Sequence, residues 1–174
     1  MTEPTSEKNQ TEAPTGPSVL QSREDIRDAV AALIGLARRD IMLFTPQMES
    51  FFFNSSQIGQ MMASFAARHH QNRARIVVED AAQVLRDNDR LVGVCRRFSE
   101  FIQMRQVGDE HRGLREMFLV VDGVSFLHQP DITEPKCVVE PAGRKYCVDV
   151  RRRFDLMWDR SEPLVGLYTA GLGT

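Results

Sequence analysis

The residues of this sequence that could do chemistry gather between positions 111 and 131. They are His111, Arg112, Arg115, Asp122 and His128. An arginine recognises phosphate through a bidentate fork and need not react with it, so Arg115 and its basic neighbours could form an anion-binding pocket. The alternative is that Arg115 pairs with Asp122, Glu116 or another carboxylate, while His111 and Arg112 are ordinary loop residues. Asp122 also suits a turn, because its side chain can accept backbone hydrogen bonds.

Two other groups of side chains could bind a partner. Phe51, Phe52 and Phe53 are consecutive and follow a predicted strand, so at least one is expected to cover a pocket, a tail or a second subunit. The alternative is that neighbouring helices absorb all three rings. A second group is basic and comprises Arg144, Lys145, Arg151, Arg152 and Arg153. Arg151, Arg152 and Arg153 belong to a predicted helix over 146–160. Acidic residues are interspersed among the basic ones along this helix, and no aromatic residue lies on its outer face, which favours a solvated face over a nucleic-acid site.

Two polar pairs favour structural roles. Glu79 and Asp80 follow a predicted strand, where open α/β sheets bind ligands. Without a histidine or a further carboxylate at metal-ligand spacing, they are expected to cap the next helix. His69 and His70 are adjacent at a helix end and point to different sides, which argues against a shared metal ion.

The composition is that of an ordinary soluble domain. The 174 residues are 42% hydrophobic and 26% charged, with a formal net charge of -2. This balance argues against global attraction to nucleic acid or anionic membranes, although a local basic face remains open. The sequence predicts neither a membrane span nor a signal peptide, and no cofactor. The three cysteines form no CxxC pair and indicate buried, reduced thiols in a cytoplasmic protein; they are Cys95, Cys137 and Cys147.

The clearest structural prediction is a pair of strands joined by a tight turn. Met117 to Val121 is continuously apolar, as in a strand buried on both faces, and Val124 to Leu127 returns beside it. Between them, Asp122-Gly123 is the strongest short signal for a β-hairpin. We therefore expect this hairpin to lie at the centre of the fold.

The remaining elements alternate between helix and strand. Apolar residues at helical spacing predict a helix over Arg23 to Arg39, and Asp40 to Thr45 is a short apolar strand. A second helix runs to about His69 and a buried strand over Arg75 to Val78 follows, so the two strands are expected to be parallel. The later elements are two helical pieces within 81–100, a strand over 101–107, a short edge strand over 136–140 and a helix over 146–160.

Composition also divides the chain into three parts. Residues 1–18 are rich in Thr, Glu, Pro, Ser and Gln and are predicted to be a disordered tail. Residues 19–161 form the predicted α/β domain. Residues 162–174 contain three glycines and are expected to be an extended or loose C-terminal extension.

This order of elements resembles one half of the phospholipase D superfamily. FLVVDGVSFL resembles the family's central strand pair, and VDVRRRFDLMWDRS resembles its closing helix rich in Phe and Trp. The resemblance covers roughly Asp40 to Ser161. It implies one half-domain with a mixed sheet flanked by helices.

The catalytic motif of that family is altered here. Its central strand carries HxKxxxxD, and counting back from Asp122 puts Arg115 at the His position and Met117 at the Lys position. The family's His is a nucleophile that forms a phospho-enzyme, which neither a guanidinium nor a thioether can replace. The downstream GSxxN-like segment is also replaced, by Leu127 to Asp131. The resemblance therefore implies the scaffold without the chemistry.

Three hypotheses about function follow. The first is a non-catalytic binding or regulatory module that pairs with a protein partner or with itself. The second is a phosphodiester-processing or phosphate-binding enzyme with an unconventional site around Arg115, Asp122 and His128. The third is a weak nucleic-acid binder that uses Arg151 to Arg153, which the charge balance disfavours. The chain also resembles an uncharacterised proteobacterial family of degenerate domains associated with GNAT-type acetyltransferases. This resemblance implies such an acetyltransferase as a partner. The acetyl-CoA loop of these enzymes, RxxGxG/A, is absent from this chain, so the chain is not expected to be the acetyltransferase itself.

Overall fold

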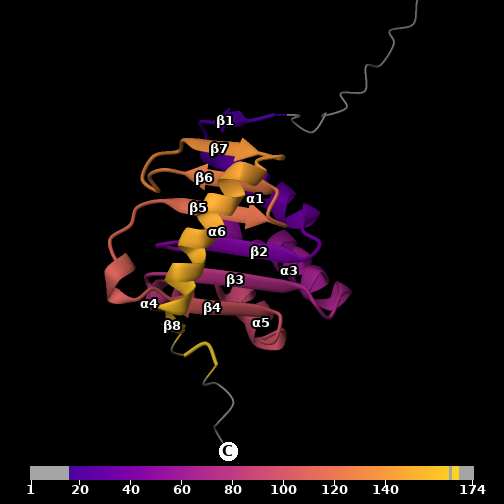
Figure 1. Ribbon diagram of the computed structural model, residues 1–174. Coiled ribbons are helices and arrows are strands. Elements are labelled where there is room, and N and C mark those ends of the chain that lie inside the picture. Colours follow the sequence, from indigo (N-terminus) through magenta and orange to yellow (C-terminus); the bar gives the residue numbers. More distant parts are fainter. Residues whose placement is uncertain (1–15, 165, 169–174) are drawn as a thin grey trace, which may run out of the picture.

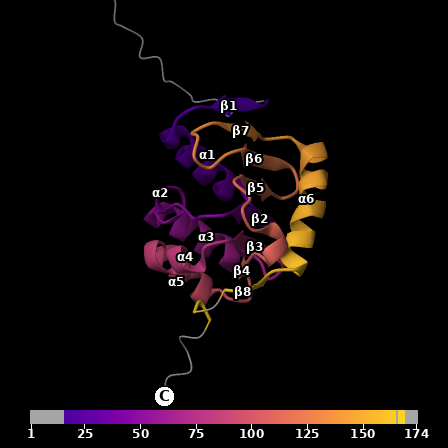
Figure 2. The same ribbon diagram turned by 90° about the vertical axis from the view of Figure 1, so that its left-hand side faces the viewer.

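One mixed sheet organises the chain. The computed structural model describes residues 16–164 and 166–168. In this part, eight strands form a single sheet in the order β1-β7-β6-β5-β2-β3-β4-β8. Helices α1 to α5 lie on one face of the sheet, and α6 crosses the other face alone (Figures 1 and 2). This arrangement confirms the predicted α/β fold with a mixed sheet flanked by helices.

The parallel part of the sheet comprises β2 (Asp40–Thr45), β3 (Arg73–Val78) and β4 (Ile102–Gln106). The crossover from β2 to β3 contains α3 (Ser56–Arg68), as the predicted βαβ unit requires. Two short helices, α4 (Ala81–Asp87) and α5 (Asp89–Arg97), connect β3 to β4. Parallel strands and crossover helices therefore bring the carboxyl ends of β2 and β3 to one edge.

The predicted hairpin is confirmed and lies beside β2. Strands β5 (Met117–Val121) and β6 (Ser125–Gln129) pair antiparallel, and β5 also pairs antiparallel with β2. At the turn, Asp122 and Gly123 both have positive φ angles, 54° and 65°. A type I′ turn requires positive φ at both central residues, and its twist matches that of the two strands it joins.

Two apolar cores lie on the two faces of the sheet. Helix α1 (Arg23–Leu36) buries one face against the strands, and Ser22 caps its first turn by accepting a hydrogen bond from Asp25 N. On the opposite face, α6 (Arg144–Asp159) buries Val150, Phe154 and Met157 against the sheet. Alternate residues of the central strands supply both cores, which explains why β5 is apolar throughout.

Several predicted boundaries were wrong. The first helix ends at Leu36 rather than Arg39, because the Asp122 carboxylate accepts hydrogen bonds from the N–H groups of residues 38–40. The last helix begins at Arg144, two residues before the predicted start. Strand β7 (Cys137–Glu140) is not an edge strand, since β1 (Ser18–Leu20) pairs with its outer side.

Other elements escaped the sequence prediction. Residues 50–53 form a short helix, α2 (Ser50–Phe53), and not a loop, and residues 109–111 form the 3-10 helix η1 (Asp109–His111). Within the predicted C-terminal extension, β8 (Glu162–Pro163) pairs with β4, and Leu164 and Leu167 are buried. Most of the predicted N-terminal tail, residues 1–15, and the last residues, 169–174, lie outside the described residues.

Candidate functional site

A pocket of about 270 Å³ opens at the edge where β2 and β6 end and β5 begins. Open α/β sheets place their ligand sites at such carboxyl ends of parallel strands. We call it the β2–β5 pocket, and the sheet edge around it the pocket end. Its walls are formed by Arg23, Thr45, Gln47, Glu49, Phe52, Met117, Gln129, Ile132 and Thr133.

The wall next to β2 is fixed by side-chain hydrogen bonds. Gln83 brackets the backbone of Met48, donating to its carbonyl (2.8 Å) and accepting from its N–H (3.0 Å). The buried Asn88 donates to the same carbonyl (2.9 Å). Arg23 and Glu49, which both line the pocket, form a bidentate ion pair with nitrogen–oxygen distances of 3.1 and 2.9 Å. The pocket is therefore preorganised and contains a neutralised pair of charges.

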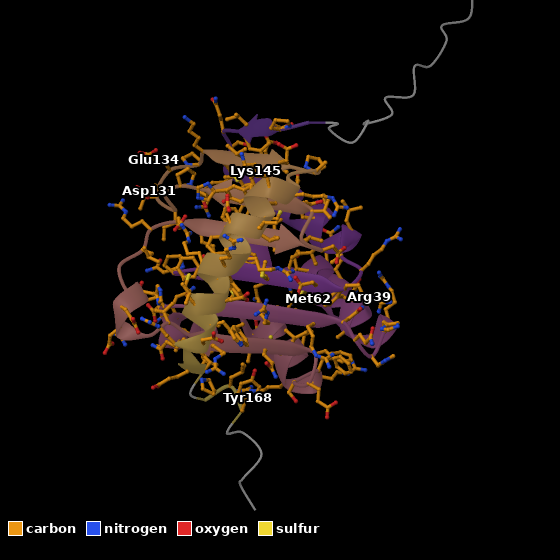
Figure 3. The ribbon with its side chains drawn as sticks, viewed as in Figure 1. Arg39, Met62, Asp131, Glu134, Lys145 and Tyr168 are labelled. Atoms are coloured by element: carbon orange, nitrogen blue, oxygen red, sulfur yellow. The ribbon has the colours of Figure 1, made fainter. Side chains whose placement is uncertain are left out.

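The two residues at the positions that the resemblance assigns to the family's catalytic His and Lys both lie at the pocket end. Met117 lines the pocket and supplies a neutral thioether. Arg115 instead turns to the loop after β6, where it pairs with Asp131 (3.0 Å) and donates to Thr133 Oγ1 (3.1 Å). Figure 3 shows Asp131 at this edge. Hydrogen bonds from Thr133, together with Arg115, hold the pKa of Asp131 below its usual value. The guanidinium is thus already partnered by a carboxylate.

The five residues predicted to form an anion pocket are not brought together. Asp122 lies at the other end of β5 from Arg115, roughly 20 Å away along an extended strand. Its carboxylate accepts three backbone N–H groups at 2.8 to 3.0 Å, so the alternative role as a turn acceptor is confirmed. Arg112 pairs with Asp109 (3.2 Å) on an exposed loop, and His111 ends η1 in the same loop.

His128 belongs to a separate network on the α6 face of the sheet. Its Nε2 donates to Glu116 (3.0 Å), and Arg153 of α6 donates to the other oxygen of the same carboxylate. Burial alone would raise the pKa of Glu116, but the hydrogen bonds from Arg153 and His128 lower it. Arg151 of α6 likewise pairs with Asp40 (2.7 Å). Two of the three consecutive arginines therefore tie α6 to the sheet, and Arg152 is exposed on the outer side.

The three phenylalanines have different environments. Phe53 is buried in the core, and Phe52, only 3% exposed, lines the β2–β5 pocket. Phe51 is 37% exposed and lies under the guanidinium groups of Arg23 and Arg27, which are 5.2 and 5.0 Å from its ring centre. One of the three rings, that of Phe52, therefore covers a pocket, as expected. The ring of Phe51 is partly exposed and remains accessible to a partner.

The other polar pairs have structural surroundings. Asp80 caps α4 by accepting from Gln83 N (2.9 Å), as predicted, while Glu79 accepts from Gly113 N (3.2 Å). No group of three metal-ligating side chains that could hold an ion occurs in the described part of the chain. The three cysteines are buried, as predicted. Burial raises the pKa of their thiols to about 12, 12 and 11, which makes them poor nucleophiles; they are Cys95, Cys137 and Cys147.

Sequence reasoning missed most of the pocket lining. Thr45, Gln47 and Gln129 lie at strand ends, which was a usable signal, because ligand sites of α/β sheets form there. Arg23 and Glu49 carried no such signal, since they meet only when α1 and α2 pack side by side.

No helix within residues 16–164 and 166–168 is long and apolar enough to cross a membrane.

Comparison with solved structures identifies the fold. Nuc from Salmonella typhimurium, a phospholipase D family member, matches with a TM-score of 0.62 and 16% identity, over 84% of this chain and 97% of Nuc. NucT from Helicobacter pylori matches with a TM-score of 0.63 and 11% identity, over 84% of this chain and 98% of NucT. TrmBL2, an archaeal chromatin protein, gives 0.65 and 10% identity, over 89% of this chain and 56% of TrmBL2. These likenesses show a phospholipase D-like fold.

Comparison with sequences gives a family without a described function. No curated protein matches this chain. A family model does match, over residues 22–168, which includes every described helix and strand except β1. The chain therefore belongs to the family described as Domain of unknown function (DUF7931).

Proposed function

We propose that this chain is a non-catalytic, cytoplasmic phospholipase D-like module that acts by binding a protein partner or a second copy of itself. The observation that carries the proposal is the lining of the β2–β5 pocket. Met117 lies there at the position that the resemblance assigns to the family's Lys, and Arg115, at the His position, is paired with Asp131. A thioether cannot hold a phosphate by charge, and a guanidinium stays protonated at every usable pH.

The surface beside the pocket supports an interaction role. Phe51 is exposed on α2, next to Phe52 in the pocket wall, and the cations of Arg23 and Arg27 rest on its ring. Aromatic and arginine side chains are the residue types enriched at the centres of protein interfaces. We therefore assign the contact surface to α2 and the first turns of α1.

The absence of catalysis is tested with an activated phosphodiester. Purified protein is incubated with bis(p-nitrophenyl) phosphate, and release of nitrophenolate is followed against a buffer blank. We expect no turnover above the blank. Turnover that disappears in His128→Ala would contradict the proposal and support a phosphodiesterase with unconventional residues.

The interaction surface is tested by light scattering across a range of protein concentrations. A second copy as the partner predicts a mass that rises with concentration in the native chain and stays monomeric in Phe51→Ser. Val148→Ser is the matched control, because Val148 is an exposed apolar residue on α6. A monomeric mass at every concentration, together with no stoichiometric partner captured from native cell extract, would contradict the proposal.

A further inference from the structure

Four exposed arginines meet at the sheet edge opposite the β2–β5 pocket. Arg38 and Arg39 lie in the connection from α1 to β2, and Arg68 and Arg73 flank the connection from α3 to β3. The two connections touch, because Arg73 N donates to Arg39 O (3.0 Å) and Arg68 Nη1 donates to Ala37 O (3.3 Å). Figure 3 shows Arg39 projecting from this edge, opposite Asp131. We call these four residues the arginine edge.

The positive charge of the arginine edge is not neutralised by the described residues. None of its four guanidinium groups forms an ion pair within residues 16–164 and 166–168. Two carboxylates of the same edge are engaged elsewhere: Asp40 pairs with Arg151, and Asp122 accepts the backbone N–H groups of residues 38–40. Arg73 donates to the backbone carbonyls of His70 (2.9 Å) and Asn72 (2.8 Å), whereas the side chains of Arg38 and Arg39 donate to none of the described residues. In a chain of net charge -2, the four guanidinium groups form a concentrated site of positive charge.

Two imidazole rings lie beside these cations. His69 and His70, in the connection from α3 to β3, stack with their ring centres 4.5 Å apart and their planes 23° apart. The prediction that they point to different sides was wrong, because α3 ends at Arg68 and the two residues are not helical. His69 Nδ1 accepts from Gln71 N (3.1 Å), which fixes the ring. Desolvation, with the nearby charges of Arg39 and His70, lowers the pKa of His69 and so favours its neutral form. Since His70 is exposed, the pair offers an aromatic surface next to the arginines.

We propose that the arginine edge binds single-stranded nucleic acid, with the guanidinium groups on successive phosphates and a base stacked on His70. Guanidinium forks match phosphate oxygens, and exposed bases stack on aromatic rings that include histidine. A lipid surface presents phosphates but no rings to stack. The apolar side chains needed to enter a bilayer are also scarce, because Leu36 is the only exposed large apolar residue described in 36–39 or 68–73.

The test is the salt dependence of binding to a fluorescent oligothymidylate, measured by anisotropy. Four phosphate contacts predict a slope of log Kobs against log salt of about -3, at roughly -0.7 per phosphate of a single strand. Replacing both Arg38→Gln and Arg39→Gln should make the slope about 1.4 units shallower and weaken binding about tenfold at low salt. These two side chains make no hydrogen bond or ion pair with the described residues, so the double variant should fold normally.

Two further variants separate this site from general attraction to positive charge. Arg144→Gln with Arg152→Gln removes the same charge from α6 and should leave the affinity and the slope unchanged. His70→Ala should weaken binding of the single strand more than binding of a duplex, because only unpaired bases can stack on the ring. A wild-type slope near zero, an equal loss in both double variants, or binding only to phosphatidylserine vesicles would overturn the proposal. None of these outcomes depends on whether the β2–β5 pocket is catalytic.

Discussion

The two ends of the central strands treat charge in opposite ways. At the pocket end two arginines are held in ion pairs: Arg23 with Glu49, and Arg115 with Asp131. At the arginine edge the guanidinium groups extend without a carboxylate partner among the described residues, and the local acids serve the fold instead. Two arginines beside the β2–β5 pocket are therefore paired with carboxylates, whereas the four of the arginine edge have no carboxylate partner among the described residues.

The place of a charged residue in a sequence motif therefore does not tell whether its charge is available to a ligand. Arg115 lies at the position that the resemblance assigns to the family's nucleophile, and its guanidinium is paired with the carboxylate of Asp131. Asp122, which the resemblance matches to the Asp of the family's motif, lies at the opposite end and organises the loop that carries Arg38 and Arg39. The Asp122 carboxylate thus supports the arginine edge rather than the β2–β5 pocket.

The largest expected loss of stability comes from Phe52, in the wall of the β2–β5 pocket. Phe52→Ala should lower the free energy of unfolding by about 3 to 5 kcal/mol, because it leaves a cavity where a 3% exposed ring was packed. Phe51→Ala, at the half-exposed neighbour, should cost less than about 1 kcal/mol. Urea denaturation measures both. Equal costs for the two rings would contradict the distinction between a wall residue and a contact residue.

The next effect tests whether Asp122 builds the arginine edge. Asp122→Ala should lower the free energy of unfolding by about 3 kcal/mol, since three N–H groups lose a charged acceptor and alanine is strained at a φ of 54°. Oligothymidylate affinity should fall as well, because the loop with Arg38 and Arg39 loses its anchor. Asp109→Ala is the control, at a carboxylate whose side chain is 96% exposed. If the control lowered stability as much, the anchoring role of Asp122 would be wrong.

A smaller effect at the pocket end depends on pH. Glu116→Gln should cost about 1 kcal/mol at neutral pH, because Arg153 and His128 lose their carboxylate partner. The folded-state pKa of Glu116 lies below its ordinary value of 4.5. Its contribution is therefore present above pH 4.5 and is lost as the pH falls through the folded-state pKa. Urea titrations from neutral to acid pH should show the difference between variant and wild type shrinking; a constant difference would argue against the ion-pair network.

The smallest expected change in stability comes from the exposed ion pair between Arg115 and Asp131. Arg115→Ala should change the free energy of unfolding by less than about 0.5 kcal/mol, because a solvated ion pair contributes little. The melting temperature and the affinity for inorganic phosphate should both stay at the wild-type values. Phosphate binding by the native chain that disappears in this variant would show that the pocket end still holds an anion site.

Local patterns predicted the elements whose signals lie within a few residues. The Asp122-Gly123 turn, the apolar run of β5 and the cap at Asp80 were all predicted correctly, because each depends on backbone preference or neighbouring residues. Strand β1 and the two residues of β8 were missed, since such short strands exist only by pairing with a sheet edge.

The amino-acid sequence alone predicted the architecture: alternating helices and apolar strands, and a hairpin at Asp122-Gly123. It also predicted, through the resemblance to the phospholipase D pattern, that Arg115 and Met117 occupy the His and Lys positions. Which charged side chains are paired with an opposite charge became visible only in the folded structure. Arg115 and Asp131 are sixteen residues apart, and Arg39 and Arg73 lie farther apart still, so their pairing or meeting depends on how strands and connections pack. Side-chain charge is written in the sequence, but its neutralisation is set by distances across the fold.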